Sequence, residues 1–393
     1  MANPKLVLLK LRQFWHVLVM KKVWNNIYFK IFGISALFIF VTFLMSLIWS
    51  FIYRKGTPYT INIFNLWDTV HYLYIAKYGY CTSKCIPAYE QFSIVFFPLY
   101  SLLIRFFQFF THNYMLGALV VSNVFYILTI LFLYKLVRKD FSHEISLRAI
   151  LLLSAFPTAY FLHFGYTESL FLFLVVSSFY YAINKKWLTA SLLGMLASLA
   201  RINGILLFPA ILIEYLIGHK EVNKQSGIKI KKDIFYTVLI PIGSLLYLFI
   251  NYVHFHNPFQ FMIFQKEHWG EYFSSPITGL MGDINGFHWR PINEWLNWTL
   301  PQIIFAFFAV IIILLSAKKI RLSYSIYSFL SLIILVCCSF WMSIPRFVVV
   351  IFPIFIFLAL ILRKRRYFYP TILFFIILQI FFLTRFLSGQ WAF

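Results

Sequence analysis

The sequence predicts an all-α polytopic membrane protein, and three properties of the chain lead to that prediction. Of its 393 residues, 62% are hydrophobic and 12% are charged, which is about half of the charged fraction usual in a soluble domain. The mean hydropathy is +0.81. The apolar residues fall in successive runs, many of them close to the roughly 20 residues that a helix needs to cross the hydrocarbon core. We expect residues 1–393 to form a single transmembrane domain.

The runs predict about eleven membrane-spanning helices. Residues 1–30 precede the first run and mix lysines with large apolar residues, as in a basic helix that lies at the membrane interface. The segment 94–110 is apolar but is interrupted by Pro98 and Arg105, so we expect it to be re-entrant or interfacial rather than a full span. The predicted spans are 31–53, 115–137, 147–164, 168–183, 187–200, 203–217, 234–253, 300–316, 323–342, 345–362 and 367–387.

Basic residues indicate which side of the membrane each loop occupies. Clusters of Lys and Arg recur after every second run, so all of them can lie on one side, which the positive-inside rule makes cytoplasmic. The N-terminus is then cytoplasmic, and two large loops, 54–93 and 254–300, are external and carry short amphipathic helices. The same rule explains the net charge of +22, and we expect no nucleic-acid partner.

The acidic residues argue against an ion-coupled transporter. There are twelve in the chain, and the predicted topology places none of them halfway across the membrane, where such transporters usually need a carboxylate. Seven lie toward the outer face, among them Asp68, Glu90 and Glu168. An enzyme that works at the outer leaflet fits this distribution better.

The chain is organised around the polar segment 65–80, NLWDTVHYLYIAKYGY. In a helix that starts at Asn65, the side chains of Asp68, His71, Tyr72 and Ile75 share one face because they are three or four residues apart. An alternative interpretation is that Asn65 caps this helix and that Asp68 only complements the helix dipole.

WDTVHYLYIAKYGY (67–80) resembles the first external loop of the PIG-V family of mannosyltransferases, which has the pattern WD, HYL, IA and GY. Further blocks resemble the same family in the same order, although Asn203 stands where proline is common. These blocks are FFPLYSLLIR (96–105), FPTAYFLHFGYTESLFLF (156–173), LASLARINGILLFPAILIEYL (196–216), NPFQFMIFQKEHWGE (257–271), SIPRFVVVIFPIFIFLA (343–359) and RFLSGQWAF (385–393).

The resemblance implies a GT-C-type glycosyltransferase fold and an inverting reaction. The donor would be a sugar, with mannose implied by the family, linked to polyprenyl or dolichyl phosphate, and the acceptor a glycolipid or another surface glycan. Asp68 is then the candidate general base for the acceptor hydroxyl. A lipid phosphate leaves without help from a protein acid. We expect neither a cofactor nor a metal.

The other candidate site residues come from the matching blocks. Arg346 and Arg201 would bind the donor phosphate, although either could instead reach for lipid headgroups. His71 and Tyr72 are candidate substrate-binding residues, and His71 would bind phosphate or sugar or line the cleft. Glu168, in the YTES block, would orient the acceptor or support the cleft, unless it only complements a helix N-terminus. In the loop 254–300, the block residues are Gln265, His268 and Trp269.

Several points stay open in the sequence. Cys81 and Cys85 lie in an external loop that permits a disulfide. The histidines of 254–300 lack zinc-binding spacing. The acceptor and the oligomeric state are not indicated. A transporter of lipids or polysaccharide precursors, or a non-catalytic scaffold of the same fold, remains the alternative. The expected location is a prokaryotic cytoplasmic membrane, or the endoplasmic reticulum membrane in a eukaryote, with the active site external.

Overall fold

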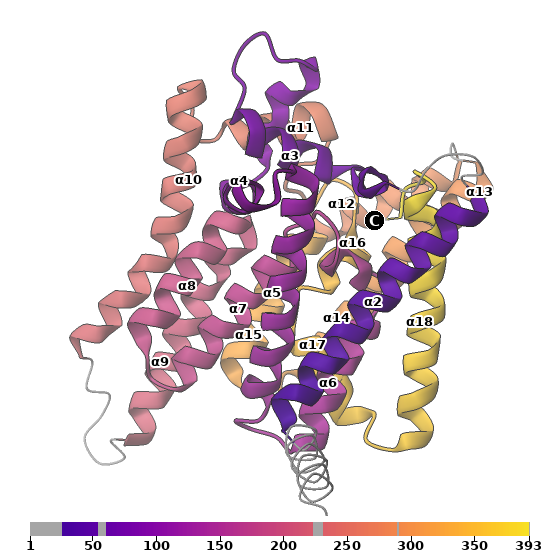
Figure 1. Ribbon diagram of the computed structural model, residues 1–393. Helices are drawn as coiled ribbons and strands as arrows, with labels where there is room; N and C mark the ends of the chain where they lie inside the picture. Colours follow the sequence, from indigo (N-terminus) through magenta and orange to yellow (C-terminus); the bar gives the residue numbers. More distant parts are fainter. Residues whose placement is uncertain (1–25, 54–59, 223–230, 289–290, 393) are drawn as a thin grey trace, which may run out of the picture.

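The computed structural model describes residues 26–53, 60–222, 231–288 and 291–392. Most of the predicted interfacial stretch 1–30 lies outside this part of the chain, as do 54–59 and 289–290 of the two external loops. The described residues are almost entirely helical (Figure 1), with one isolated antiparallel bridge between Phe273 and Cys338. The all-α prediction is therefore confirmed.

Five described helical segments are long and apolar enough to cross a membrane, so the chain is an integral membrane protein. Each contains about 23 residues or more, beyond the roughly 20 needed for the hydrocarbon core. They are α2 (Ile27–Tyr53), α5 (Tyr114–Val137), η5 with α10 (Lys232–Phe255), α13 with η7 and α14 (Ile292–Ser316), and α18 (Arg365–Leu387).

The remaining predicted spans are shorter or broken, so the count of about eleven is not confirmed. Proline removes a backbone donor and disfavours helix in the preceding residue. Accordingly the run 147–164 divides around Pro157 into α6 (His143–Ala155) and η3 (Ala159–Leu162), and 345–362 divides at Pro353 into α16 (Ile344–Val348) and α17 (Pro353–Ile361). The other short helices are α7 (Glu168–Ile183), α8 (Trp187–Ala200), η4 (Ile202–Leu206), α9 (Leu207–Val222) and α15 (Leu322–Val336).

The segment that we expect to be re-entrant has a sharp bend. Two helices, η2 (Ala88–Val95) and α4 (Pro98–Thr111), meet there at 113°. The hydroxyl of Tyr100 on α4 lies 2.7 Å from Ser122 Oγ on α5, so α4 is held against α5. Such a bend suits a broken span as well as a re-entrant segment, and the choice between them stays a prediction.

Helix α5 lies at the centre of the bundle, against α2, α4, α6 and α7 (Figure 1). The packing continues from α7 to α8 and from α8 to α10. A β-carbon at Gly243 of α10 would lie 2.2 Å from the carbonyl oxygen of Met195 on α8. Only glycine permits this approach of two backbones, as in many membrane helix pairs.

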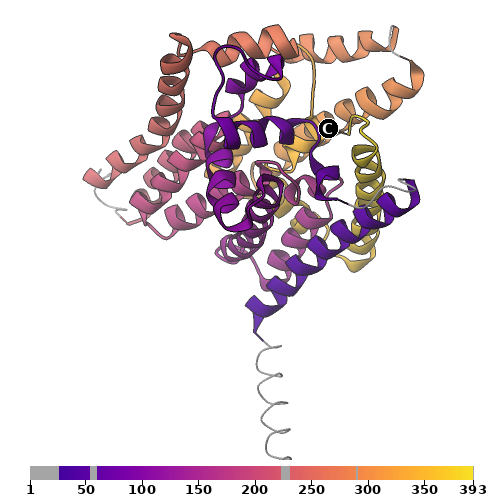
Figure 2. The ribbon, with the colours of Figure 1, turned by 45° about the horizontal axis from the view of Figure 1, so that its top comes forward.

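The short helices of the two large loops gather at one end of the bundle. They are α3 (Asp68–Tyr78), α11 (Gln260–Trp269) and α12 (Pro276–Asn285), and α16 lies beside them (Figures 1 and 2). Cys81 and Cys85 form a disulfide at this end. At the opposite end, Arg321 joins Asp140 of the α5–α6 connection to Glu214 of α9.

Candidate active site

Asp68 is the first residue of α3, which differs from the predicted start at Asn65. The Asn65 amide donates to the carbonyl of Asn62 and ends the preceding helix η1 (Ile61–Phe64). The predicted capping role of Asn65 is therefore wrong, because Trp67 occupies the N-cap position. Asp68 keeps the place that the helix dipole favours for a carboxylate.

The backbone of Trp67 is strained where the chain turns into α3. Its φ is 54° and its ψ is −126°, a region that residues other than glycine rarely adopt. Two contacts hold the turn: the Trp67 ring meets the edge of Trp391 at 4.9 Å, and Tyr166 donates a hydrogen bond to the Leu66 carbonyl. Strain of this kind persists where the surroundings impose it, and it is common at functional sites.

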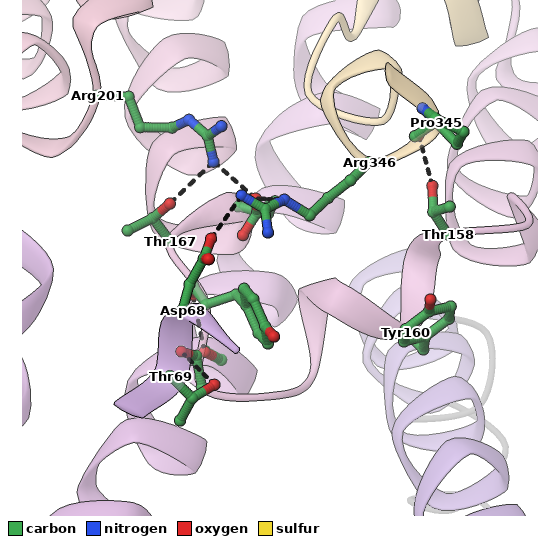
Figure 3. Close-up of polar contacts among 12 residues, drawn as sticks. Asp68, Thr69, Thr158, Tyr160, Thr167, Arg201, Pro345 and Arg346 are labelled. Atoms are coloured by element: carbon green, nitrogen blue, oxygen red, sulfur yellow. Dashed lines mark hydrogen bonds and ion pairs between the residues drawn. The ribbon is translucent and has the colours of Figure 1, made fainter. Parts of the chain in front are cut away.

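Asp68 forms an ion pair with Arg346 of α16. Asp68 Oδ2 and Arg346 Nη2 are 2.7 Å apart, and the Asp68 side chain is 23% exposed whereas that of Arg346 is 9% exposed. Helix α16 is fixed from two sides, since Thr158 donates to the Pro345 carbonyl at 2.7 Å (Figure 3) and Gln302 Oε1 accepts from the Ile344 amide. The carboxylate is thus held from one side and open on the other.

Glu168 lies behind this pair, at the start of α7, and is fully buried. Its Oε1 accepts a hydrogen bond from Arg201 Nη1 at 2.7 Å and lies 3.1 Å from Arg346 Nε, a charge contact without hydrogen-bond alignment. Arg201 Nη1 also donates to Thr167 (Figure 3). Two carboxylates and two guanidinium groups therefore compensate one another, as buried charges must.

Both arginines lie close to one aromatic ring. The guanidinium carbon of Arg201 is 4.9 Å from the centre of the Phe347 ring, and that of Arg346 is 5.0 Å from it. Arg346 also lies over Phe161 and Tyr166. These cation–π contacts add to the ion pairs in a site from which water is largely excluded.

Helix α3 packs against the turn that precedes α7. The hydroxyl of Thr69 donates to the Gly165 carbonyl at 3.2 Å (Figure 3). A β-carbon at Gly165 would lie 2.6 Å from Thr69 Cγ2, so glycine is required for this contact. The placement of Asp68 thus depends on a residue that we did not single out in the sequence.

Tyr72 and His71 follow Asp68 on α3 and have different surroundings. Tyr72 is buried, and burial together with the charge of Asp68 raises the pKa of its phenol, which therefore stays protonated. His71 Nδ1 lies 3.1 Å from Oε2 of the fully buried Glu90, and its ring stacks on Phe96. Glu90 is a residue that no family block indicates; the signal for it is an acid in an otherwise apolar stretch.

The three candidates from the second external loop are not equally close to this centre. Trp269 reaches it, with its ring 6.0 Å from that of His71. His268 stacks on Phe92, and partial burial followed by the charge of His71 lowers its pKa. Gln265 instead donates to Glu271 Oε2 at 2.5 Å. Among the described residues, no group of three or more His, Cys, Asp and Glu side chains is arranged to hold a metal.

Two comparisons with known proteins match this architecture. Residues 97–250 match the model of the dolichyl-phosphate-mannose-protein mannosyltransferase family. The crystal structure of ArnT from Cupriavidus metallidurans bound to undecaprenyl phosphate superposes with a TM-score of 0.51 at 14% sequence identity, covering 86% of this chain. The chain has an ArnT-like fold. It spans 62% of the ArnT chain, and no curated protein sequence matches it significantly.

These matches agree with the prediction of a GT-C-type membrane fold and with the predicted class, a glycosyltransferase that uses a lipid-phosphate sugar. The matching family model is not that of PIG-V. The structure joins Asp68, Glu168, Arg201 and Arg346 in one cluster and places His71, Tyr72 and Trp269 around α3. The catalytic and binding roles of all the candidate residues stay predictions.

Proposed function

We propose that the protein is an inverting glycosyltransferase that moves a sugar from a polyprenyl-phosphate donor to an acceptor hydroxyl at the external leaflet. The observation that carries the proposal is the Asp68 carboxylate, partly exposed and held by Arg346 at one end of an ArnT-like bundle. The family model matching 97–250 supports a lipid-phosphate-linked donor. Mannose, as in the PIG-V family, is the sugar we propose.

In this mechanism Asp68 removes the proton of the acceptor hydroxyl. The acceptor oxygen attacks the anomeric carbon, and the bond from that carbon to the phosphate oxygen breaks with its electron pair on the phosphate. Arg346 orients the carboxylate through Oδ2. The buried Glu168 holds Arg346 and Arg201 side by side, which keeps the base within the ~0.5 Å tolerance that catalysis demands.

The orientation in the membrane belongs to the same proposal. Basic connections such as Lys318–Arg321 would be cytoplasmic, and α3, α11 and α16 external. The ion pair of Arg321 with Asp140 lies at the end of the bundle opposite to Asp68, in agreement with this orientation. We propose about eleven crossings in total, with the shorter and broken helices forming the crossings that the five long segments do not supply.

The experiment is sugar transfer by the purified protein in nanodiscs. It uses polyprenyl-phosphate-mannose with a panel of glycolipid acceptors, and compares wild type, Asp68→Asn and Glu294→Gln. Glu294 is an exposed acid of the second external loop, so its substitution removes the same charge away from the site. We expect donor-dependent transfer in wild type and Glu294→Gln, a loss of about 10²–10⁴-fold in Asp68→Asn, and a product anomer opposite to that of the donor.

Other outcomes would contradict separate parts of the proposal. Transfer that survives in Asp68→Asn removes Asp68 as the base. A product that keeps the donor's anomeric configuration rules out a single inverting displacement. A folded wild type that binds the lipid but consumes no donor with any acceptor supports the transporter or scaffold alternative.

A further inference from the structure

Glu90 is a buried acid that the mechanism above does not use. It lies on η2, its side chain is fully buried, and Oε1 has no hydrogen-bond partner among the described residues. An isolated carboxylate is costly to bury unless a cation compensates it. Its ion-pair partner is His71, whose Nδ1 lies 3.1 Å from Oε2.

The His71 ring is fixed in orientation by its neighbours. It stacks on Phe96 with ring centres 4.6 Å apart, and the rings of Tyr89 and Trp269 approach at 5.7 and 6.0 Å. Nδ1 faces Glu90. Nε2 makes no hydrogen bond with any described residue, and 13% of the side chain remains exposed. A protonated imidazole donates from both nitrogens, so Nε2–H is free to donate to a ligand.

His71 lies one helical turn after Asp68 on the same face of α3, where β-carbons are about 5–6 Å apart. The other two cations of the site already have counter-charges in contact, because Arg346 pairs with Asp68 and Arg201 with Glu168. His71 also contacts its counter-charge, Glu90, but only through Nδ1, which leaves Nε2 available. Tyr89 on η2 and His268 on α11 are further neighbours of the ring, and the pKa of His268 is lowered by partial burial and then by His71.

We propose that Glu90 is a positioning residue that holds the His71 ring through Nδ1 and compensates its positive charge, and that His71 Nε2 donates a hydrogen bond to the phosphate of the lipid-linked donor. The inference rests on the proposed glycosyltransferase function. As the sugar–phosphate bond breaks, the phosphate changes from a diester with one negative charge to a monoester that gains a second. The imidazolium stabilises that added charge, while the proton of the acceptor goes to Asp68.

Transfer kinetics and a double-mutant cycle test this assignment. His71→Gln lowers kcat/KM about tenfold or more, because the hydrogen bond from Nε2 to a charged group is lost, and His71→Lys, which keeps a cation, restores part of the rate. Glu90→Gln also lowers kcat/KM, and it causes no further loss in a His71→Gln background, because Glu90 acts through His71. His254→Gln, a substitution of another external histidine, leaves the wild-type kinetics unchanged.

Binding of polyprenyl phosphate without a sugar gives a second readout. We expect its affinity to fall about tenfold in His71→Gln and in Glu90→Gln, and to recover in His71→Lys. Wild-type affinity in Glu90→Gln, or no recovery in His71→Lys with the fold intact, overturns the inference alone. A wild type that transfers no sugar at any pH overturns the proposed function instead.

Discussion

The carboxylate of Asp68 and the guanidinium of Arg346 meet at 2.7 Å, joining α3 of the first external loop to the connection between α15 and α17. The same arginine lies 3.1 Å from Glu168. One side chain therefore couples the candidate base to a fully buried acid on α7. The geometry of Asp68 depends on Arg346 as much as on α3 itself.

Arg346 is expected to tolerate no conservative replacement. In Arg346→Lys the charge remains but the planar fork that reaches both carboxylates is lost, so kcat/KM should fall about 10²-fold or more. In Arg346→Met the two acids lose a cation, and we expect about 3–5 kcal/mol of destabilisation. Transfer assays and thermal unfolding in detergent check both variants against Arg366→Met, which alters an exposed arginine of α18. Near-normal transfer by Arg346→Lys would refute the coupling.

Gly165 offers a test of how α3 is positioned. Gly165→Ala places a methyl group 2.6 Å from Thr69 Cγ2, a clash that should displace α3 and lower transfer about 10²-fold, the cost typical of a 1 Å misplacement. Adding Thr69→Ser removes that methyl group and keeps the hydroxyl, so the double variant should recover most of the activity. Gly33→Ala, at an α2 glycine with open space around it, is the control. If the second substitution brings no recovery, the clash is not the cause.

Glu271 predicts a pH dependence of stability. Burial raises the pKa of its carboxyl above the ordinary value. Below the ordinary pKa, both folded and unfolded chains bind the proton, so this residue contributes nothing. As the pH rises, the unfolded chain releases the proton first, and the folded state loses stability through the window up to the raised pKa. Glu271→Gln should lack this loss while still accepting the hydrogen bond of Gln265.

Thermal unfolding between pH 4 and 7 measures the effect of Glu271. The Tm of wild type should fall relative to that of Glu271→Gln as the pH increases. The exposed neighbour Glu267 supplies the control, since Glu267→Gln should follow wild type at each pH. Parallel curves for wild type and Glu271→Gln would show that the Glu271 carboxyl titrates alike in both states.

The disulfide provides a test of orientation. Disulfides persist on the oxidising side of a membrane, so Cys81 and Cys85 should face outward in the proposed topology. In a Cys337→Ser/Cys338→Ser background, a membrane-impermeant maleimide should label intact cells only after reduction. A cysteine introduced at Lys185 should react only after the membrane is opened. The reverse pattern would invert the whole topology.

Sequence periodicity predicted several long apolar helices closely, and α5 and α18 begin within two residues of the predicted runs. Periodicity could not predict the packing between distant segments. Whether 345–362 forms one helix depends on Pro353 and on the anchoring of Pro345 by Thr158, a contact between distant segments. The start of α3 was misplaced by three residues, because Asn65 forms its hydrogen bond with Asn62 instead of capping the helix that follows.

At the candidate site, motif resemblance indicated Asp68, Glu168, Arg201 and Arg346, and the structure brings all four together. The resemblance did not indicate that the two arginines form ion pairs with the two acids. Nor did it indicate Glu90 or Gly165, since a buried counter-charge and a close backbone approach are visible only in three dimensions.

The shared oxygen of Glu168 also bears on the order in which the protein is made. During synthesis Arg201 follows Glu168 by one helical hairpin, so this acid gains its first cation early. Arg346 arrives only after α15 has been inserted, and until then Asp68 lacks its ion-pair partner. Sugar transfer would therefore report that insertion has proceeded past α15, and no shorter nascent chain would be able to act on the donor.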